Sequence, residues 1–588
     1  MRSHGAGTLT ASDIDTEVTV AGWVQKRRDH GGIAFFDLRD ATGLIQVVAD
    51  PELHPTVDEL KMEYCVQVTG TVRQRPEGTE NPDLATGMVE IGAEVVTVLA
   101  PAKTLPFMID DRTEIDERTR LQHRYLDLRR PRMAANLKAR SRATAAIRRT
   151  LDDLGFLEIE TPTLINSTPE GARDMLVPSR LRQGEFYALP QSPQLFKQLL
   201  MISGVERYFQ IARCYRDEDT RADRQLEFTQ LDLEGAFWGR DDVLDTIEKV
   251  LAATVREIRG EEITLPFPRL TWHEVMDRFG VDKPDLRFGM EIVDLTDQLT
   301  ETGFGVFKDI IESAGTVRGI NAGHMEWSRA RADALTDRAK ELGAKGLVWM
   351  VVEDDGSLRS PVAKFLSEGE QEAIGKTLDA EPGDVLLIAA DTWRTTVEVL
   401  GGLRNDLGRP AGHDDLAFLW VVDFPLFEEA EDGSITFSHH PFTSPASIEE
   451  MRERPESAIS KAYDAVLNGV ELGSGSIRIH DPGVQRQVFE ILGIDSETAE
   501  RRFGWFLEAL EYGTPPHGGF AFGIDRLVMV LQGESSIREV IPFPKTQSGV
   551  DPMTGAPTWV EESQLAELGV DLTAETRARR QDDEADPT

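Results

Sequence analysis

The sequence has few of the features that mark secreted and membrane proteins. It contains two cysteines, Cys65 and Cys214, too few and too far apart for a disulfide framework or a thiolate zinc site, so we expect two reduced thiols. No apolar run approaches the roughly 20 residues that span a bilayer. The opening residues, MRSHGAGTLTASDI, lack the apolar core of a signal peptide. We therefore expect a cytoplasmic protein that has no membrane partner.

Positive charge is also scarce. The chain has 64 Lys and Arg residues against 103 Asp and Glu residues, which gives a formal net charge of −39. A charge of this sign argues against nonspecific adhesion to nucleic acid, so any RNA must be bound by local basic patches. The 588 residues, 40% of them hydrophobic, predict several globular domains, since a domain typically has about 100 to 200 residues.

Five short runs between Val18 and Leu99 alternate apolar and polar residues and are separated by HGG, ATG and PEG. Five strands in so short a segment predict a small Greek-key barrel of the OB type, a fold that commonly binds oligonucleotides. A structural barrel without a ligand is the alternative. The next residues are rich in Pro, Asp and Arg and predict a hinge, followed by a helix over 138–154 and a strand, FLEIETPTL, broken at Pro162.

Beyond the hinge, helices and strands alternate irregularly, which predicts a large antiparallel α+β sheet. A segment with helical runs such as SRARADALTDRAKELG and strands such as GDVLLIAAD carries little chemistry and predicts an inserted α+β domain. The final TRARRQDDEADPT lacks apolar periodicity and predicts a solvated tail. We divide the chain into an OB barrel, a hinge, a first catalytic part, the insertion, a second catalytic part and a C-terminal extension, at residues 1–105, 106–135, 136–285, 286–413, 414–560 and 561–588.

The segment RCYRDEDTRADRQLEFTQLDLE, residues 213–234, interleaves charged and apolar side chains. A strand, loop and strand would turn Arg216, Glu218, Gln230 and Asp232 to one side. The Arg216 guanidinium suits a phosphate or carboxylate, and Glu218 can accept a hydrogen bond from an exocyclic amine. A structural ion-pair network would explain these residues equally well.

A second segment, GGFAFGIDR at 518–526, is an apolar strand punctuated by glycines that runs into the helix LVMVLQG. Small residues let a flat ring approach the backbone, and Arg526 could stack on a base and reach a phosphate. Such a turn is also common for packing reasons alone. This segment indicates a nucleotide site only because it occurs together with the first segment.

Together these segments resemble class II aminoacyl-tRNA synthetases: RDED with TQLD resembles motif 2, GIDR motif 3, and the helix and strand ending at Pro162 motif 1. TPEGARD, QSPQLFKQLLM, HHPFT and ELGSGSIRIH resemble the bacterial-type aspartyl members. The resemblance implies a multidomain α+β protein with an OB-fold barrel, an antiparallel-sheet catalytic domain and an inserted α+β domain. Two departures from the family pattern are Leu226 in RQLEF and Ser474 in ELGSGS.

The resemblance implies site residues for L-aspartate and ATP, which react to aspartyl-adenylate before transfer to tRNA. Those implied for aspartate are Glu170, Ser192, Gln194, Lys197, Arg216, Asp232, His439, His440 and Arg478. Those implied for ATP are Arg216, Asp217, Glu218, Gln225, Glu471, Gly523, Ile524, Asp525 and Arg526, with Arg216, Glu218 and Arg526 as catalytic residues. Asp464 and Glu471, separated by an Asn468–Gly469 turn, would hold Mg²⁺, because paired carboxylates suit a hard cation. Unrelated surface acids are the alternative.

In the barrel, Arg28, Phe35 and Gln46 are implied to bind the anticodon, within a basic patch of Lys26, Arg27, Arg28 and Arg39. His30 after the RRD run and Gly78 in RPEGTEN replace the Leu and Lys typical of members that discriminate between tRNA(Asp) and tRNA(Asn). The resemblance therefore implies aspartylation of both tRNAs, and motif 1 implies a homodimer. A strictly tRNA(Asp)-specific enzyme, a relative using asparagine or lysine, and a noncatalytic RNA-binding protein on a synthetase scaffold are the alternatives.

Overall fold

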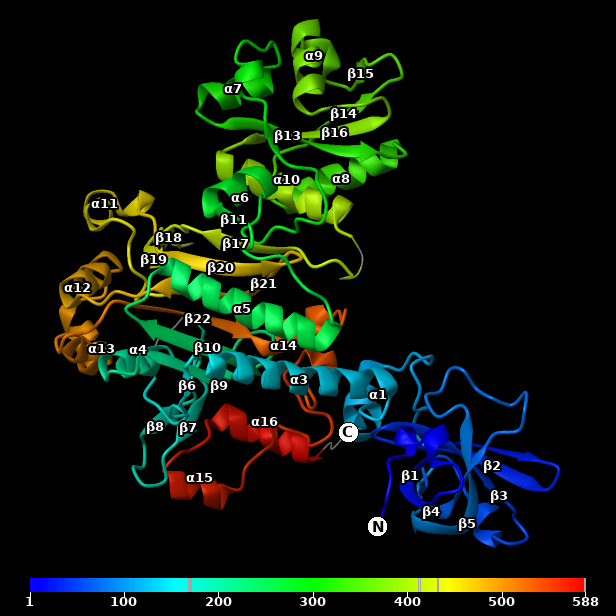
Figure 1. Cartoon of the computed structure of the whole chain (residues 1–588). Helices are drawn as coiled ribbons and strands as arrows, with labels where there is room; N and C mark the ends of the chain where they lie inside the picture. Colours follow the sequence, from blue (N-terminus) through cyan, green and yellow to red (C-terminus); the bar gives the residue numbers. More distant parts are fainter. Residues whose placement is uncertain (168–171, 411, 413, 431–432, 586–588) are drawn as a thin grey trace. The chain divides into compact units, whose positions relative to one another are not determined.

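The computed structural model describes every residue except 168–171, 411, 413, 431–432 and 586–588 (Figure 1). The chain forms two compact units, Met1–Arg132 and Met133–Thr588, and each is described by itself. Cys65 and Cys214 are both thiols. Among the helices of the described residues, none is long and apolar enough to cross a membrane.

The first unit contains a closed five-stranded barrel in the order β1-β2-β3-β5-β4, so the predicted OB barrel is confirmed. Alternate side chains such as Val18, Val20 and Phe36 are fully buried inside it, because successive residues of a strand point to opposite faces. The HGG turn has Gly31 and Gly32 at φ +60° and +81°, which a two-residue hairpin turn requires. The strands are β1 (Glu17–His30), β2 (Ile33–Asp40), β3 (Gly43–Ala49), β4 (Cys65–Gln74) and β5 (Val89–Ala100).

The residues after the barrel are more helical than the sequence predicts, with α1 (Glu117–Gln122), α2 (Arg124–Asp127) and α3 (Pro131–Asp153). Arg129 lies 4.7 Å from the ring centre of Trp23 and forms a 2.8 Å ion pair with Glu63 of the barrel. These contacts hold the later part of the predicted hinge against the barrel within the first unit.

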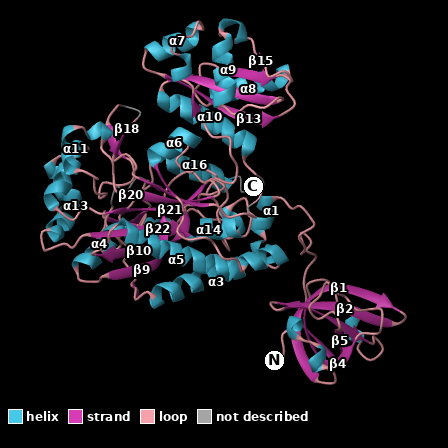
Figure 2. Ribbon diagram, turned by 45° about the horizontal axis from the view of Figure 1, so that its top comes forward, coloured by secondary structure: helices cyan, strands magenta, loops and turns pink. Residues whose placement is uncertain are grey.

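The second unit is built on an eight-stranded sheet in the order β11-β17-β20-β21-β22-β10-β9-β6 (Figures 1 and 2). Its inner pairs are antiparallel, as predicted, whereas the edge pairs β11 with β17 and β6 with β9 are parallel. The strands are β6 (Leu157–Glu158), β9 (Arg207–Tyr215), β10 (Glu227–Ala236), β11 (Arg269–Thr271), β17 (Phe418–Val422), β20 (Ala462–Leu467), β21 (Val470–Ile477) and β22 (His517–Gly523).

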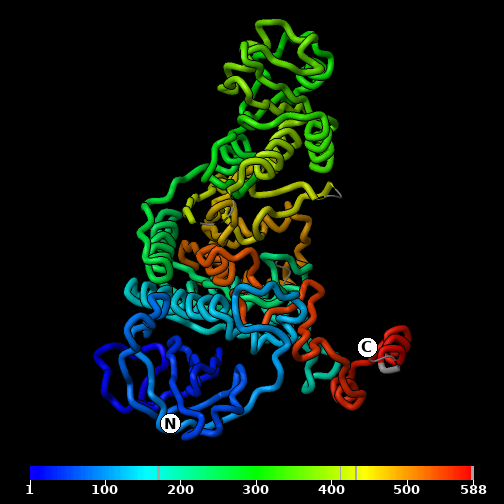
Figure 3. The backbone as a smooth tube through the Cα atoms, turned by 90° about the vertical axis from the view of Figure 1, so that its right-hand side faces the viewer, coloured from blue at the N-terminus to red at the C-terminus, as the bar shows by residue number. Residues whose placement is uncertain are grey.

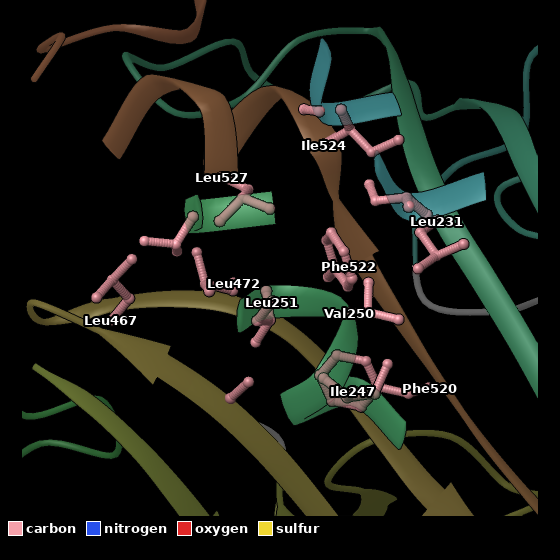
Figure 4. Packing of buried hydrophobic residues seen from close by; sticks show 14 of the residues in the cluster. Leu231, Ile247, Val250, Leu251, Leu467, Leu472, Phe520, Phe522, Ile524 and Leu527 are labelled. Carbon is pink, nitrogen blue, oxygen red and sulfur yellow. The ribbon is translucent and has the colours of Figure 1, made fainter. Parts of the chain in front are cut away.

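One face of this sheet carries the main core. Leu231 and Leu233 of β10 pack there with α3, α5 (Arg240–Arg259) and α14 (Ile524–Leu531) (Figure 4). Because a strand alternates its faces, Gln230, Asp232 and Glu234 point to the opposite side. The alternation therefore separates core residues from polar residues along a single strand.

Smaller elements complete the second unit. Helices α4 (Gln194–Ile202) and α13 (Ser496–Leu510) share a core that includes Leu195 and Phe503. The remaining elements are β7 (Leu176–Pro178), β8 (Phe186–Ala188), β18 (Phe427–Glu429), β19 (Ile435–Phe437), α11 (Ile448–Glu453), α12 (Pro482–Ile491), α15 (Glu562–Leu568) and α16 (Ala574–Ala585).

Two local predictions were wrong. The predicted strand FLEIETPTL is paired only at Leu157–Glu158, since only these two residues lie beside β9. The predicted solvated tail forms α16, because Ala, Glu, Arg and Gln favour helix even without an apolar stripe. Arg580 also pairs with Glu562 of α15 at 3.3 Å, which ties the two helices together.

The residues between the two catalytic segments form their own five-stranded sheet in the order β12-β13-β16-β14-β15. In Figure 3 this green trace leaves the large sheet and returns to it. Separate hydrophobic cores lie against its two faces. Helix α6 (Trp272–Phe279) precedes this segment in the chain. The elements of the segment are β12 (Val293–Asp294), α7 (Gly305–Glu312), β13 (Thr316–His324), α8 (Arg329–Glu341), β14 (Val348–Val352), β15 (Leu358–Arg359), α9 (Glu368–Thr377), β16 (Asp384–Asp391) and α10 (Trp393–Gly408).

Candidate functional site

A pocket of about 310 Å³ lies on the polar face of the eight-stranded sheet. Its walls come from α4, the β9–β10 connection, β10, β21, β22 and α14, which flank the insertion on both sides in sequence. Most of the residues implied by the resemblance therefore meet in one cavity. Those that line it are Ser192, Gln194, Lys197, Arg216, Glu218, Gln225, Asp232, His439, His440, Glu471, Arg478, Gly523, Asp525 and Arg526.

Four other implied residues have different positions. Glu170 lies outside the described residues. Ile524 is fully buried in the main core, and Asp217 is half-exposed beside Arg173. Asp464 is buried behind the wall, where it contacts His439.

Lys197, Asp232 and Arg478 line the closed end of the pocket, and Glu234 lies behind them. We call these four residues the buried cluster; each side chain is at most 2% exposed. Lys197 Nζ lies 2.8 Å from Asp232 Oδ1 and 3.2 Å from Glu234 Oε2. Arg478 donates from Nε and Nη2 to the two oxygens of Glu234 at 2.8 and 3.1 Å. Two cations and two carboxylates thus balance one another without water.

Asp232 has an unsatisfied carboxylate. Its 2.8 Å ion pair with Lys197 lies outside hydrogen-bond geometry, and neither oxygen has a hydrogen-bond partner among the described residues. Burial raises the pKa of Asp232, although the charge of Lys197 works against this. A buried carboxylate without hydrogen bonds is costly. Asp232 is therefore poised to accept hydrogen bonds from a cationic ligand.

Two histidines line the pocket beside the buried cluster. Burial and the charge of Arg478 hold the pKa of His440 well below its usual range, so the ring is neutral and accepts a 2.7 Å hydrogen bond from Arg478 at Nε2. Burial would lower the pKa of His439 too, but the carboxylate of Asp464, 3.1 Å away, raises it. Nδ1 of His439 is buried and has no hydrogen-bond partner in the described part of the chain.

The β20–β21 hairpin brings Asp464 and Glu471 together. Asn468 and Gly469 occupy its turn at φ +53° and +75°, as the sequence predicts, and the Asn468 side chain bonds the backbone of Asp415 and Ala417. Burial raises the pKa of Asp464 to about 6; His439 opposes this rise and the Glu471 carboxylate adds to it. The two carboxylates therefore repel each other.

The other end of the pocket is wider and is lined by Arg216, Glu218, Asp223, Arg224 and Arg526, which we call the open cluster; their side chains are 24 to 47% exposed. The Arg216 guanidinium lies over the Phe228 ring, 5.1 Å from its centre, and its buried Nε has no hydrogen-bond partner among the described residues. Arg526 donates to the Glu471 carbonyl at 2.6 Å. Arg216, directly after β9, and Arg526, in the first turn of α14, thus line the same pocket.

Two other lining residues are held by the protein itself. Asp525 pairs with Arg140 of α3 and accepts a 2.9 Å hydrogen bond from the Thr229 backbone, which fixes the start of α14 against β10. Gln225 exchanges hydrogen bonds with the backbone of Lys545 at 2.8 and 3.1 Å. Asp525 and Gln225 therefore hold the pocket wall in place by bonding to other parts of the protein.

Sequence reasoning missed Glu234 and Arg140. Glu234 could have been found, because TQLDLE places it two residues after Asp232 and thus on the same face of the strand. No sequence pattern pointed to Arg140, because its ion-pair partner Asp525 lies 385 residues away in the sequence.

Comparison with known proteins decides the family. Residues 116–547 match the model of "tRNA synthetases class II (D, K and N)", and residues 18–99 match that of the "OB-fold nucleic acid binding domain". The chain belongs to the class II tRNA synthetases. Similar relatives include the aspartate–tRNA(Asp/Asn) ligases of Moorella thermoacetica, 54% identical over 97% of each chain, and of Thermobifida fusca, 50% identical over 98% of this chain and 99% of the relative.

Solved structures share the fold of this class II synthetase. Asparaginyl-tRNA synthetase from Pyrococcus horikoshii, complexed with asparaginyl-adenylate, aligns with a TM-score of 0.57 at 19% identity, over 91% of this chain and 96% of that one. A putative aspartyl-tRNA synthetase from Leishmania major aligns with a TM-score of 0.58 at 21% identity, over 92% and 94%. At these identities the likeness concerns the fold.

The barrel of this class II synthetase presents the residues implied to bind an anticodon on one face. Arg28 lies opposite Phe35 on neighbouring strands, and both side chains are at least partly exposed. Arg28 pairs with Asp37 at 2.9 Å and contacts the amide oxygen of Gln46 at 3.4 Å. The amide nitrogen of Gln46 donates to Glu90 at 2.8 Å. The polar groups of this face are thus oriented before any ligand arrives.

The rest of the implied basic patch is partly neutralised. Arg27 pairs with Asp29 and Asp58, and Arg39 donates to both oxygens of the buried Glu63. Lys26 and His30 are exposed. Gly78 is exposed at φ +83°, and the space around it is open.

Proposed function

We propose that this synthetase activates L-aspartate with ATP and aspartylates both tRNA(Asp) and tRNA(Asn). The observation that carries the proposal is that four side chains of one pocket each have a buried polar atom without a hydrogen-bond partner among the described residues: Gln194, Arg216, Asp232 and His439. Buried polar groups normally find partners, so these atoms indicate where a polar ligand binds. The high identity to aspartate–tRNA(Asp/Asn) ligases supports the same activity.

The buried cluster is assigned to aspartate. Lys197 and Arg478 supply donors for the side-chain carboxylate, while Asp232 and Gln194 lie where the α-ammonium and α-carboxylate would be held. Desolvating a carboxylate requires paired cations. Asparagine would turn its carboxamide NH₂ toward N–H donors that then lack an acceptor, so the pocket favours aspartate by an amount on the order of several kcal/mol. Ser192, His439 and His440 complete the assigned wall.

The open cluster is assigned to ATP. Arg216 would contact the α-phosphate, Glu218 would accept from the adenine amine, and Arg526 would reach the terminal phosphate. Phe228 holds the Arg216 guanidinium in place. Gly523 leaves the wall flat for the nucleotide, and Gln225 buttresses it.

The reaction then needs no protein nucleophile. The aspartate α-carboxylate attacks the α-phosphorus, and pyrophosphate leaves. The 3′-terminal hydroxyl of tRNA next attacks the activated carbonyl, loses its proton, and AMP leaves as the mixed-anhydride C–O bond breaks. Arg216 opposes the negative charge that accumulates at the α-phosphate, and the buried cluster fixes the direction of attack. The protein therefore contributes to catalysis by orienting the substrates and by stabilising the charge at the α-phosphate.

Asp464 and Glu471 fit a magnesium ion. They are oxygen donors. Burial raises the pKa of Asp464 and the charge of Glu471 adds to the rise, and a divalent cation would relieve the repulsion between the two carboxylates. In the described part of the chain no three metal-binding side chains come together, so phosphate oxygens of ATP would complete the shell. Bound there, Mg²⁺ would neutralise phosphate charge.

The barrel is assigned to the anticodon, with Phe35 as a stacking platform and Arg28 and Gln46 as polar contacts. Stacking on an aromatic side chain contributes roughly 1 to 3 kcal/mol per base. Gly78 places no long cation near the third anticodon base, and His30 can donate or accept a hydrogen bond. This combination supports relaxed choice between the two tRNAs, which differ there by C against U.

The assignment extends to domains, assembly and location. Residues 1–105 form the anticodon-binding domain, 136–285 and 414–560 the catalytic domain, 286–413 the insertion and 561–588 the extension, after a hinge at 106–135. A homodimer is supported by Leu157 at the β6 sheet edge and by Leu164, which are 57% and 52% exposed. A cytoplasmic location is part of the proposal and is supported by the use of aminoacylated tRNA in translation.

Aminoacylation of purified tRNA(Asp) and tRNA(Asn) with aspartate tests the proposal. We expect the parent to charge both, and the double variant His30→Leu with Gly78→Lys to lose preferentially the asparagine tRNA. Because residue 78 has positive φ, His30→Leu with Gly78→Ala is the matched control for backbone strain without the cation. A parent that leaves tRNA(Asn) uncharged while saturating tRNA(Asp) would establish a strictly tRNA(Asp)-specific enzyme.

A further inference from the structure

Glu234 lies directly behind the two cations of the buried cluster. It is fully buried and does not belong to the pocket wall as described, whereas Lys197, Asp232 and Arg478 do. Both of its oxygens are used: Oε1 accepts from Arg478, and Oε2 lies 3.1 Å from Arg478 Nη2 and 3.2 Å from Lys197 Nζ. Burial would raise the pKa of Glu234, but the charges of Arg478 and Lys197 lower it, so it is ionised.

The sheet makes space for this carboxylate. Glu234 of β10 lies opposite Gly519 of β22, and a Cβ at position 519 would come within 1.9 Å of Glu234 Oε2. Real Cβ atoms do not approach an oxygen so closely, so a side chain at 519 would displace the carboxylate. The absence of a side chain there allows Glu234 to reach both cations at once.

The N–H donors of Arg478 and Lys197 that face Glu234 determine how many donors remain for a ligand. Arg478 has five N–H groups, of which two go to Glu234 and two, at 2.7 Å each, to Ser476 and His440. Lys197 has three N–H groups and lies within ion-pair distance of both carboxylates of the cluster. By this count over the described residues, one N–H of Arg478 remains for a ligand. The Lys197 ammonium is held between the two carboxylates by charge and also keeps a donor for a ligand.

We propose that Glu234 is a positioning residue that makes the pocket select a carboxylate over a carboxamide. Lys197 and Arg478 occupy the acceptor oxygens of Glu234. The ligand side chain therefore contacts N–H donors of these two cations and does not contact the Glu234 carboxylate. A carboxylate satisfies two converging donors, whereas the NH₂ of a carboxamide would face them without an acceptor. The inference rests on the proposed aspartate activation and acts through Lys197 and Arg478.

The test is ATP–pyrophosphate exchange by the full-length enzyme, with aspartate or asparagine as substrate, for the parent and Glu234→Gln. The glutamine variant keeps the shape but turns an NH₂ toward the cations. We expect its KM for aspartate to rise about tenfold or more, and its preference in kcat/KM for aspartate over asparagine to fall about tenfold or more. The KM for ATP should stay within about twofold, because the open cluster is untouched.

Two further variants keep the test decisive. Glu234→Asp retains the charge but is one methylene too short to hold both cations, so it should also lose preference, by less than Glu234→Gln. Glu227→Gln, on the same strand but outside the pocket wall as described, is the matched control and should keep the parental preference. If Glu234→Gln does not fold, Glu234→Asp decides.

A folded Glu234 variant that keeps both the parental aspartate KM and the parental preference would overturn the inference. So would a uniform fall in kcat with unchanged aspartate KM and preference, since a merely structural residue would produce it. A parent without aspartate-dependent exchange would instead overturn the proposed function, so the two failures are distinguishable.

Discussion

The two ends of the pocket are built differently. The buried cluster is at most 2% exposed, and its four charges lock one another in place, whereas the open cluster is 24 to 47% exposed and its ion pairs are longer, at 3.1 to 4.0 Å. Charges are screened by water at the open end and hardly at all at the closed end. On the proposed assignment, the difference means that the amino-acid end is ordered before its ligand binds, whereas the side chains of the nucleotide end are free to adjust.

The largest effect is expected from removing one cation of the closed end. Arg478→Leu, and separately Lys197→Leu, should abolish aspartate activation while leaving ATP binding largely intact, because each leaves a buried carboxylate short of a cation. ATP–pyrophosphate exchange and ATP binding measured on the same preparation check this. Exchange above about a tenth of the parental rate, the factor that about 1.4 kcal/mol represents, would break the comparison.

At the open end, Arg216→Ala should lower the rate of adenylate formation by about 100-fold while weakening ATP binding much less. The guanidinium matters most when negative charge shifts at the α-phosphate. Single-turnover kinetics at saturating ATP separate the two effects. A variant with a normal rate that only requires more ATP would assign Arg216 to ground-state binding.

The affinity for aspartate should depend on pH because of a carboxylate at the closed end of the pocket. Burial raises the pKa of Asp232, and the ionised form binds the ammonium group of aspartate much more strongly than the neutral acid does. The affinity for aspartate should therefore fall as the pH is lowered through this raised pKa, in the window above the ordinary value of about 3.9. Calorimetric titration across pH checks this, with Asp232→Asn as a control expected to bind weakly at every pH. A pH-independent affinity in the parent would remove Asp232 from the ammonium site.

The smallest effect is expected from an ion pair of the open cluster. Arg224 contacts Glu218 at 3.1 Å with both side chains partly exposed, so Arg224→Ala should change the free energy of unfolding by no more than about 1 kcal/mol. Arg478→Leu, by contrast, should cost about 3 to 5 kcal/mol. Denaturant unfolding of both variants checks the contrast, and equal losses would mean that burial does not separate the two ends.

Local patterns of the sequence predicted much of this architecture. Strict alternation gave the barrel strands, and β10 shows the same rule, with Leu231 in the core and Asp232 in the pocket. Asn468–Gly469 predicted its hairpin turn because both residues tolerate positive φ. These features depend on neighbours in the chain.

Features that depend on distant partners could not be predicted. The sequence does not indicate that Arg140 holds Asp525 or that Lys545 holds Gln225, because these pairs form only after the sheet assembles. Glu234 is an intermediate case. The alternation of side chains along β10 predicts the face of the sheet on which Glu234 lies, but its position behind two cations depends on how α4 and β21 pack. The resemblance named the cations and omitted the carboxylate that orients them.

The most direct test of the account is ATP–pyrophosphate exchange by the parent with aspartate and with asparagine in parallel. We predict exchange with aspartate and a kcat/KM for asparagine lower by about 1,000-fold or more, since the buried cluster offers converging cations to the side chain. Comparable exchange with asparagine, or none with aspartate, would contradict the claim that the closed end is built for a carboxylate.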